Sequence, residues 1–217
     1  MIEISASLLP LKIDEMVEYA NETISLGVHR LHLDIIDGKF VNQKGLPDDV
    51  VKEIIHKYHS KIKIDAHLMV VDPNSYIEKE HYKYLNTIYI HHQKDQQALK
   101  ELKNKISAQG CQPGLVINPD EPIISDENKY FNDLLIMGVV PGLSGQKMLP
   151  NTYDRLKVLN THYQQSLNKP HITLDGGVTA SDLDQLNGQL NCCVMGSAIF
   201  DKVNWQNNLK QMLVSVK

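Results

Sequence analysis

The stretch LHLDIIDGKF, residues 31–40, places one histidine and two carboxylates in and just after an apolar run. Because successive side chains of a strand point to opposite faces, His32 and Asp34 share one face. The stretch DAHLMV repeats this spacing with Asp65 and His67. A carboxylate inside an apolar strand is costly unless a cation or a hydrogen-bond donor meets it. The pattern therefore predicts a polar site at the ends of buried strands.

Outward from this stretch, short apolar runs alternate with longer amphipathic stretches along the whole chain. This alternation is typical of repeated strand-helix units with a parallel sheet. The predicted strands cover residues 2–7, 30–34, 63–68, 87–91, 112–117, 134–137, 171–174 and 193–196. Eight units in 217 residues favour an α/β fold of the (β/α)8 TIM-barrel type. A doubly wound open sheet typically has fewer strands.

Two of the amphipathic stretches carry helix signals. Residues 13–27 have an approximate apolar face, and Gly27 supplies a stop signal. That face consists of Met16, Ala20, Ile24 and Leu26. Residues 48–58 predict a second helix, with Asp48 or Asp49 as its N-cap.

The composition, with 42% apolar and 22% charged residues, is that of an ordinary globular protein. The formal net charge of -4 argues against a nucleic-acid binder with a basic surface. No linker divides the chain, so we expect a single domain over residues 1–217. We find no basic and apolar leader and no apolar stretch of about 18 residues. We therefore expect a cytoplasmic protein without membrane contact.

In a TIM barrel, catalytic groups lie at the carboxyl ends of the strands. Along the chain the residues at these ends are Ser7, His32, Asp34, His67, His91, Asn118, Met137, Asp175, Gly196 and Ser197. Two histidines and two aspartates among them form a nitrogen and oxygen set suited to one divalent transition metal: zinc, iron, manganese or cobalt. They are His32, Asp34, His67 and Asp175. Taken alone, each histidine is more simply explained as a hydrogen-bonded core residue than as a metal ligand. Asp37 and Gly38 are most simply explained as a turn.

Glycine-rich segments follow the sixth, seventh and eighth predicted strands. They are PGLSGQ at 141–146, DGG at 175–177 and GSAIF at 196–200. Backbone amides in such loops bind phosphate in many barrels of this type. Each segment alone is a weak signal, because tight turns need glycine in any case. Three in succession favour a phosphate site.

Seven motifs run through the chain in the order ISASLLP, LHLDIIDGKFV, DAHLMV, GLVINP, MGVVPGLSGQK, ITLDGGV and VMGSAIF. In sequence and in order they resemble the ribulose-phosphate 3-epimerase family. The resemblance implies a ribulose-phosphate-binding TIM barrel and a metal-dependent isomerase of carbohydrate metabolism, in the pentose phosphate pathway. Family members are commonly dimers or hexamers, so a homo-oligomer is expected.

Carried over by position, the resemblance implies that the two histidines and two aspartates named above are metal ligands. It implies that Asp34 and Asp175 are also the catalytic acid and base. The substrate-binding positions that it implies are Ser7, His67, Met69, Met137, Gly142, Leu143, Ser144, Gly145, Gly176, Gly177, Gly196 and Ser197. The PGLSGQ loop would close over the phosphate, with Gly142 and Gly145 allowing the movement.

The implied reaction explains why these residue types are needed. Inverting C3 of a ketose phosphate removes a proton next to a carbonyl and returns one to the opposite face, which two facing carboxylates can do. A metal polarises the ketone and stabilises the enediolate oxygens. The resemblance favours conversion of D-ribulose 5-phosphate to D-xylulose 5-phosphate.

Three positions depart from the family pattern. Ile36 replaces a third site methionine, Gln93 replaces a glutamate, and Gly138 replaces a threonine or serine. These changes leave open a D-allulose-6-phosphate 3-epimerase, which performs the same inversion on a sugar one carbon longer. A non-catalytic sugar-phosphate-binding barrel is the other alternative, although such a barrel has little need of a complete metal set.

Overall fold

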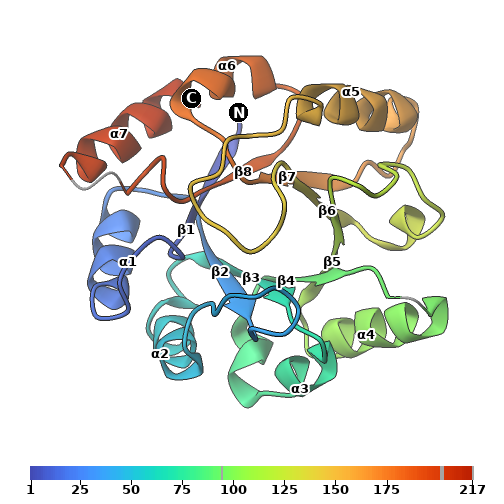
Figure 1. The fold of residues 1–217 in the computed structure, drawn as a ribbon, viewed down its shortest axis with the longest axis horizontal. Coiled ribbons are helices and arrows are strands. Elements are labelled where there is room, and N and C mark those ends of the chain that lie inside the picture. The colour runs from blue at the N-terminus through green and yellow to red at the C-terminus, as the bar shows by residue number, and fades with distance from the viewer. Residues whose placement is uncertain (94, 201–202, 217) are drawn as a thin grey trace.

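The computed structural model describes residues 1–93, 95–200 and 203–216. Eight parallel strands follow one another in chain order around a closed barrel, and β1 also pairs with β8 (Figure 1). The strands are β1 (Glu3–Ser7), β2 (Arg30–Ile36), β3 (Lys63–Met69), β4 (Thr87–His91), β5 (Gln112–Ile117), β6 (Asp133–Met137), β7 (His171–Asp175) and β8 (Cys192–Met195). The predicted α/β TIM barrel is confirmed. The largest difference in bounds is at β2, which continues to Ile36 instead of ending at Asp34.

Helices surround the barrel (Figure 1). They are α1 (Met16–Ser25), α2 (Asp48–Tyr58), α3 (Pro73–Ile77), α4 (Gln96–Ala108), α5 (Thr152–Tyr163), α6 (Leu183–Leu186) and α7 (Trp205–Ser215). Short 3-10 helices are η1 (Glu80–Tyr84), η2 (Asn128–Tyr130) and η3 (Ala180–Asp182). The connection from β5 to β6 contains η2 in place of an α-helix. Among the described residues, no helix is both long and apolar enough to cross a membrane.

Helix α2 spans the predicted residues, but its predicted cap is wrong. Pro47 occupies the N-cap. Asp48 and Asp49 lie in the first turn, where their negative charges interact favourably with the helix dipole and stabilise the helix. Helix α1 is shorter than the predicted 13–27 and ends before Gly27, whose φ of 92° few other residues adopt.

Side chains that point into the barrel form three groups from its amino-terminal to its carboxyl-terminal end. At the amino-terminal end lies a group that we call the ionic floor: Glu3, Arg30, Lys63, Asp65, Asp133 and His171. Arg30 donates from Nε and Nη2 to the two carboxylate oxygens of Asp65, at 2.7 and 2.8 Å. Asp65 shares a face with His67 but is paired with Arg30 at the amino-terminal end.

An apolar group fills the barrel interior above the ionic floor. It consists of Tyr89, Val116, Leu135, Met137, Val139 and Val194. Tyr89 of β4 reaches across to β7, where its hydroxyl lies 3.2 Å from Oγ1 of Thr173. Gly114 makes room for this ring, because a Cβ there would lie 2.2 Å from Cδ1 of Tyr89. The third group, at the carboxyl ends of the strands, contains the predicted site residues.

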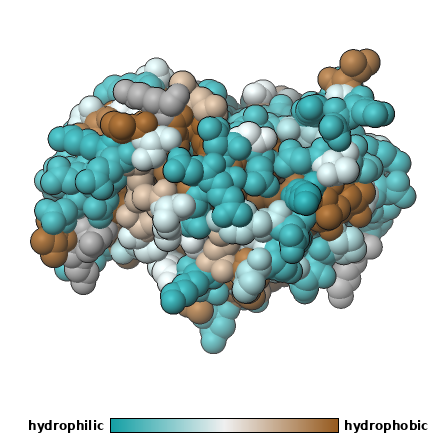
Figure 2. All heavy atoms as spheres, turned by 90° about the horizontal axis from the view of Figure 1, so that it is seen from above, coloured by the Kyte–Doolittle hydropathy of each residue, from teal (hydrophilic) through white to brown (hydrophobic). Residues whose placement is uncertain are grey.

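Most of the apolar core lies between the strands and the surrounding helices. The outer surface in Figure 2 is mainly hydrophilic, with hydrophobic residues separated by hydrophilic ones. Scattered exposed apolar side chains, such as Leu167 and Val203, are normal on a protein surface.

Candidate active site

Strands β2, β3 and β7 bring the four predicted metal ligands together. Each residue offers one ligand atom, and these atoms all lie within 4.8 Å of one another; the residues are His32, Asp34, His67 and Asp175. Nδ1 of His67 lies 3.6 Å from a carboxylate oxygen of Asp34 and 3.6 Å from one of Asp175. Nε2 of His32 lies 3.8 and 3.9 Å from the same two carboxylates. The register explains the proximity, because Asp34 pairs directly with His67.

The two carboxylates create a field that favours positive charge. Burial alone would lower the pKa of His67, but Asp175 and Asp34 raise that pKa to about 9. Burial alone would raise the pKa of Asp34, yet the neighbouring His67 and His32 imidazoles hold it below its ordinary value. A cation at this point is electrostatically favoured.

The four residues fit a divalent transition metal. Both ring nitrogens of His32 and Nδ1 of His67 are buried, and none has a hydrogen-bond partner among the described residues. Buried polar atoms in native proteins normally have a partner, and a cation between the two carboxylates would supply one to Nε2 of His32 and Nδ1 of His67, which both face that point. Two imidazoles and two carboxylates are ligands that zinc, iron, manganese and cobalt accept.

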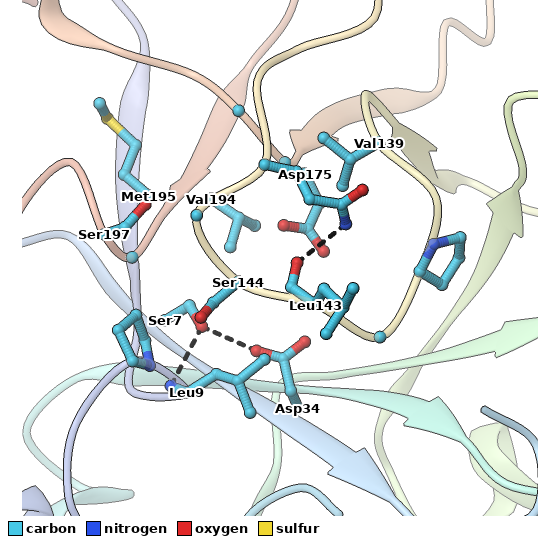
Figure 3. Close-up of a pocket in the computed structure, with 18 of the residues that line it drawn as sticks. Ser7, Leu9, Asp34, Val139, Leu143, Ser144, Asp175, Val194, Met195 and Ser197 are labelled. Atoms are coloured by element: carbon cyan, nitrogen blue, oxygen red, sulfur yellow. Dashed lines mark hydrogen bonds between the residues drawn. The ribbon is translucent and has the colours of Figure 1, made fainter. Parts of the chain in front are cut away.

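Ser7 of β1 orients the first carboxylate. Its hydroxyl donates to Oδ2 of Asp34 at 2.7 Å and accepts from the backbone N–H of Leu9 at 3.3 Å (Figure 3). A hydrogen bond to a carboxylate is stronger than one between neutral groups. The serine therefore fixes the orientation of the Asp34 carboxylate.

A cavity of about 70 Å³ lies against Asp34 and Asp175. Most predicted substrate-binding residues line it: Ser7, Met69, Met137, Gly142, Leu143, Ser144, Gly145, Gly176, Gly177, Gly196 and Ser197. His67, also a predicted substrate contact, is fully buried beneath this lining. Additional lining residues are Leu9, Pro10, Val139, Pro141, Gln146, Val178, Val194 and Met195. All eight lie in the quoted motifs, and this is the sequence signal that could have identified them.

The loop between β6 and α5 crosses the pocket, and Figure 3 shows Leu143 and Ser144 on it near Asp34. The side-chain amide of Gln146 ties the loop together by donating to the carbonyls of Val140 at 2.7 Å and Leu143 at 2.9 Å. Gly142 contacts the loop after β2, because a Cβ at this glycine would lie 2.9 Å from Cγ2 of Val41. In this structure the two loops meet across the mouth of the barrel.

The opposite end of the pocket is built from backbone. Gly177 has a φ of 73°, and a Cβ there would lie 2.1 Å from the backbone nitrogen of Met148. No lysine or arginine is among the described residues that line the pocket. An anion at this end would therefore be bound by backbone N–H groups and the hydroxyl of Ser197.

The three departures from the expected motifs do not line the pocket in the described part of the chain. Ile36 is buried and pairs in register with Met69. Gln93 donates from Nε2 to the backbone carbonyl of His91 at 3.0 Å. At Gly138 a Cβ would lie 2.6 Å from the carbonyl oxygen of Gly176, so this position faces β7 and not the pocket. Their effect on substrate choice would be indirect.

His91 lies at a predicted strand end but is not among the predicted site residues. Its Nε2 lies 2.9 Å from Nε2 of His67, and Phe40 covers its ring at a centroid distance of 4.7 Å. Burial and the neighbouring histidines hold the pKa of His91 well below its usual value. The contact depends on two strands and a loop, and no local sequence pattern indicates it.

The model of the ribulose-phosphate 3 epimerase family matches residues 3–200. The chain is 31% identical over 204 residues to the cytoplasmic isoform of ribulose-phosphate 3-epimerase from Oryza sativa subsp. japonica, covering 91% of this chain and 87% of that protein. It is 26% identical over 212 residues to ribulose-phosphate 3-epimerase from Escherichia coli strain K12, covering 96% and 93%.

Solved structures with low sequence identity share the fold. The 3-hexulose-6-phosphate synthase from Salmonella typhimurium has a TM-score of 0.71 at 15% identity and full coverage of both chains. The 3-keto-L-gulonate-6-phosphate decarboxylase from Vibrio cholerae has a TM-score of 0.71 at 10% identity, covering 99% of this chain and 97% of that one. At these identities the likeness concerns the barrel alone.

Proposed function

We infer that this chain, which belongs to the ribulose-phosphate 3-epimerase family, inverts C3 of D-ribulose 5-phosphate to give D-xylulose 5-phosphate. The chain is an epimerase, as its curated relatives are. The observation that carries the assignment to these residues is that Asp34 and Asp175 face one pocket, and that Nε2 of His32 and Nδ1 of His67 lie beside them without a hydrogen-bond partner among the described residues. A proton acceptor and a proton donor are thus available at one reacting carbon.

The two aspartates divide the proton transfers. One, as carboxylate, removes the C3 proton, while the other, protonated, delivers a proton from the opposite side of the substrate; the roles exchange in the reverse reaction. Ser7 holds Asp34 in place for this step. A divalent metal bound by His32, Asp34, His67 and Asp175 would supply Lewis-acid stabilisation of the negative charge that develops on the substrate oxygens.

The remaining lining residues position the substrate and exclude water. The phosphate binds at Gly176, Gly177, Gly196 and Ser197 in the glycine loops after β7 and β8, through backbone N–H groups and the hydroxyl of Ser197. Met69 and Met137 form an apolar wall at the reacting carbon. The loop that carries Leu143 and Ser144 moves to admit the substrate and closes over it.

The test is exchange of the C3 proton with solvent deuterium. Protein loaded with metal is incubated with D-ribulose 5-phosphate in D2O, and NMR follows the loss of the C3 proton signal and the appearance of D-xylulose 5-phosphate. No exchange by the metal-loaded protein would rule out this substrate. The same assay with D-allulose 6-phosphate tests the longer sugar, and tight binding of either sugar without exchange would indicate a non-catalytic barrel.

We further propose one divalent transition metal per chain, a single functional domain over residues 1–217, a cytoplasmic location and a homo-oligomer. Elemental analysis of the purified protein measures the metal and identifies it as zinc, iron, manganese or cobalt. Light scattering coupled to size exclusion distinguishes a dimer or hexamer from a monomer of 24.6 kDa.

A further inference from the structure

One of the two imidazoles in the ligand set has an outer partner. Nε2 of His67 lies 2.9 Å from Nε2 of His91, and the two rings stack with centroids 5.0 Å apart. Nδ1 of His67 faces Asp34 and Asp175 at 3.6 Å. His67 thus presents one nitrogen to the site and the other to His91.

The hydrogen positions follow from ligation. A nitrogen that binds a metal must offer its lone pair, so a ligating Nδ1 of His67 requires the ring hydrogen on Nε2. That hydrogen points at Nε2 of His91, which accepts it, and the hydrogen of the His91 ring then lies on Nδ1. With the opposite tautomer of His67, an N–H would point into the ligand set and block ligation.

His91 is held by packing, and its Nδ1 has no hydrogen-bond partner among the described residues. It ends β4, and only 4% of its surface is exposed. The Phe40 ring covers one side of the imidazole, and the Gln93 amide donates to the His91 carbonyl at 3.0 Å. His32 has no comparable support, because neither of its ring nitrogens has a partner among the described residues.

We propose that His91 is a positioning residue for the metal site: it accepts the Nε2 hydrogen of His67 and so fixes the tautomer and ring angle that aim Nδ1 at the two carboxylates. The inference rests on the proposed function, because it requires that the four residues bind metal. His91 does not line the pocket, so it acts through His67 and not on the substrate.

Three variants separate this role from simple packing. His91→Leu fills the space without an acceptor, His91→Gln keeps an acceptor near the position of Nε2, and His92→Leu removes the adjacent histidine, which has no hydrogen bond to His67. Each variant is prepared free of metal and titrated with Co2+, whose visible spectrum reports both affinity and coordination geometry. The unfolding temperature of each metal-free variant shows whether it folds.

We expect His91→Leu to bind Co2+ about 10 to 100 times more weakly, the usual effect of losing an outer partner of a ligating histidine. His91→Gln should remain within about threefold of the unaltered protein, and His92→Leu should match it. Unchanged affinity in a folded His91→Leu protein would overturn the proposal. Equal losses in the Leu and Gln variants would overturn it too, since they would indicate packing and not hydrogen bonding.

A measurement without substitution covers the case in which His91→Leu does not fold. Long-range 1H–15N NMR correlation of the imidazoles in the metal-free and zinc-loaded protein should show His67 protonated at Nε2 in both. A zinc-loaded His67 that carries its hydrogen on Nδ1 would refute the positioning role. If the unaltered protein binds no metal at all, the metal site of the proposed function fails, and the role of His91 fails with it.

Discussion

Asp34 and Asp65 show how residue order along a strand decides the fate of a buried carboxylate. In β2 the histidine precedes the aspartate, whereas in β3 the aspartate precedes the histidine. Two residues of a strand span about 6.6 Å, so Asp65 lies about that much closer to the amino-terminal end than His67. Asp34 consequently joins the pocket, and Asp65 pairs with Arg30 in the ionic floor. The two-residue spacing predicts that the histidine and the aspartate of each strand share a face. The order of the two residues predicts that Asp34 lies nearer than Asp65 to the carboxyl-terminal end of the barrel.

Asp175→Asn should lower kcat by about 10²- to 10⁴-fold, the usual contribution of a general acid or base, or about 3 to 5 kcal/mol of barrier. The amide is nearly the same size but cannot exchange a proton with C3. The measurement is the epimerase rate at saturating metal, with metal content determined on the same sample. Asp184→Asn, an exposed carboxylate on α6, is the control and should be neutral. A loss below tenfold in metal-loaded Asp175→Asn protein would exclude a proton-transfer role.

At the scale of elements, the strands could be predicted because each is a short apolar run between polar segments. Helix α2 could be predicted from its amphipathic pattern, but its cap could not, because Pro47 adopts the cap conformation without offering a side-chain hydrogen bond. The convergence of the four candidate ligands was predictable from the strand ends alone. The contact of His91 with His67 and that of Gly142 with Val41 were not, because they depend on how elements distant in sequence meet.

The contact between the loop after β6 and the loop after β2 should contribute to substrate binding. Gly142→Ala places a methyl group 2.9 Å from Val41 and should hold the loop open, raising KM about three- to tenfold, which is about 0.7 to 1.4 kcal/mol. Gly145→Ala is the matched control, because Gly145 also has a positive φ but has nothing within 4 Å of its Cβ position. KM and kcat for both variants are measured by steady-state kinetics.

A double substitution isolates the contact from backbone strain. Val41→Ala removes the methyl groups that the new Cβ meets, so Gly142→Ala combined with Val41→Ala should recover part of the lost affinity. If Gly142→Ala and Gly145→Ala behave alike and Val41→Ala restores nothing, the two loops do not act together.

In the molecule as a whole, the residues expected to affect stability and those expected to act in the reaction lie at opposite ends of the barrel interior. The ionic floor joins β1, β2, β3, β6 and β7 at the amino-terminal end, and the ligand set lies at the other end. Tyr89 and its apolar neighbours lie between them. Substitutions in the ionic floor should therefore change the free energy of unfolding with little effect on metal binding or turnover.

Asp133 gives the ionic floor a pH dependence. Burial raises the pKa of Asp133 to about 6, and the nearby His171 does not offset this, because burial lowers the pKa of that imidazole. Since the folded protein holds this proton more tightly than the unfolded chain, the contribution of Asp133 to stability is present below about pH 4 and is lost as pH rises through about 6. The loss is about 3 kcal/mol at most.

Asp133→Asn removes this titration. We expect the variant to gain stability relative to the unaltered protein at pH 7.5 and to gain little at pH 4.5, as measured by urea denaturation at both pH values. Turnover should be unchanged. An equal effect at the two pH values would show that Asp133 does not titrate between them.

Metal binding should stabilise the whole barrel through mass action. At a free metal concentration 100 times Kd, the gain is about 2.7 kcal/mol, which corresponds to about 5 to 11 °C in unfolding temperature for a chain of this size. Scanning calorimetry with increasing Zn2+ measures this shift, and Asp175→Asn should reduce it. No shift at any Zn2+ concentration would contradict binding by the four ligands.

The backbone construction of the phosphate end has a genetic consequence. A site built from lysine or arginine is lost when one codon changes, whereas every residue except proline offers a main-chain N–H group. At Gly177, however, no other residue fits, because a Cβ would meet the backbone of Met148. A saturation mutagenesis map of this end should therefore show wide tolerance interrupted by isolated positions where only glycine survives.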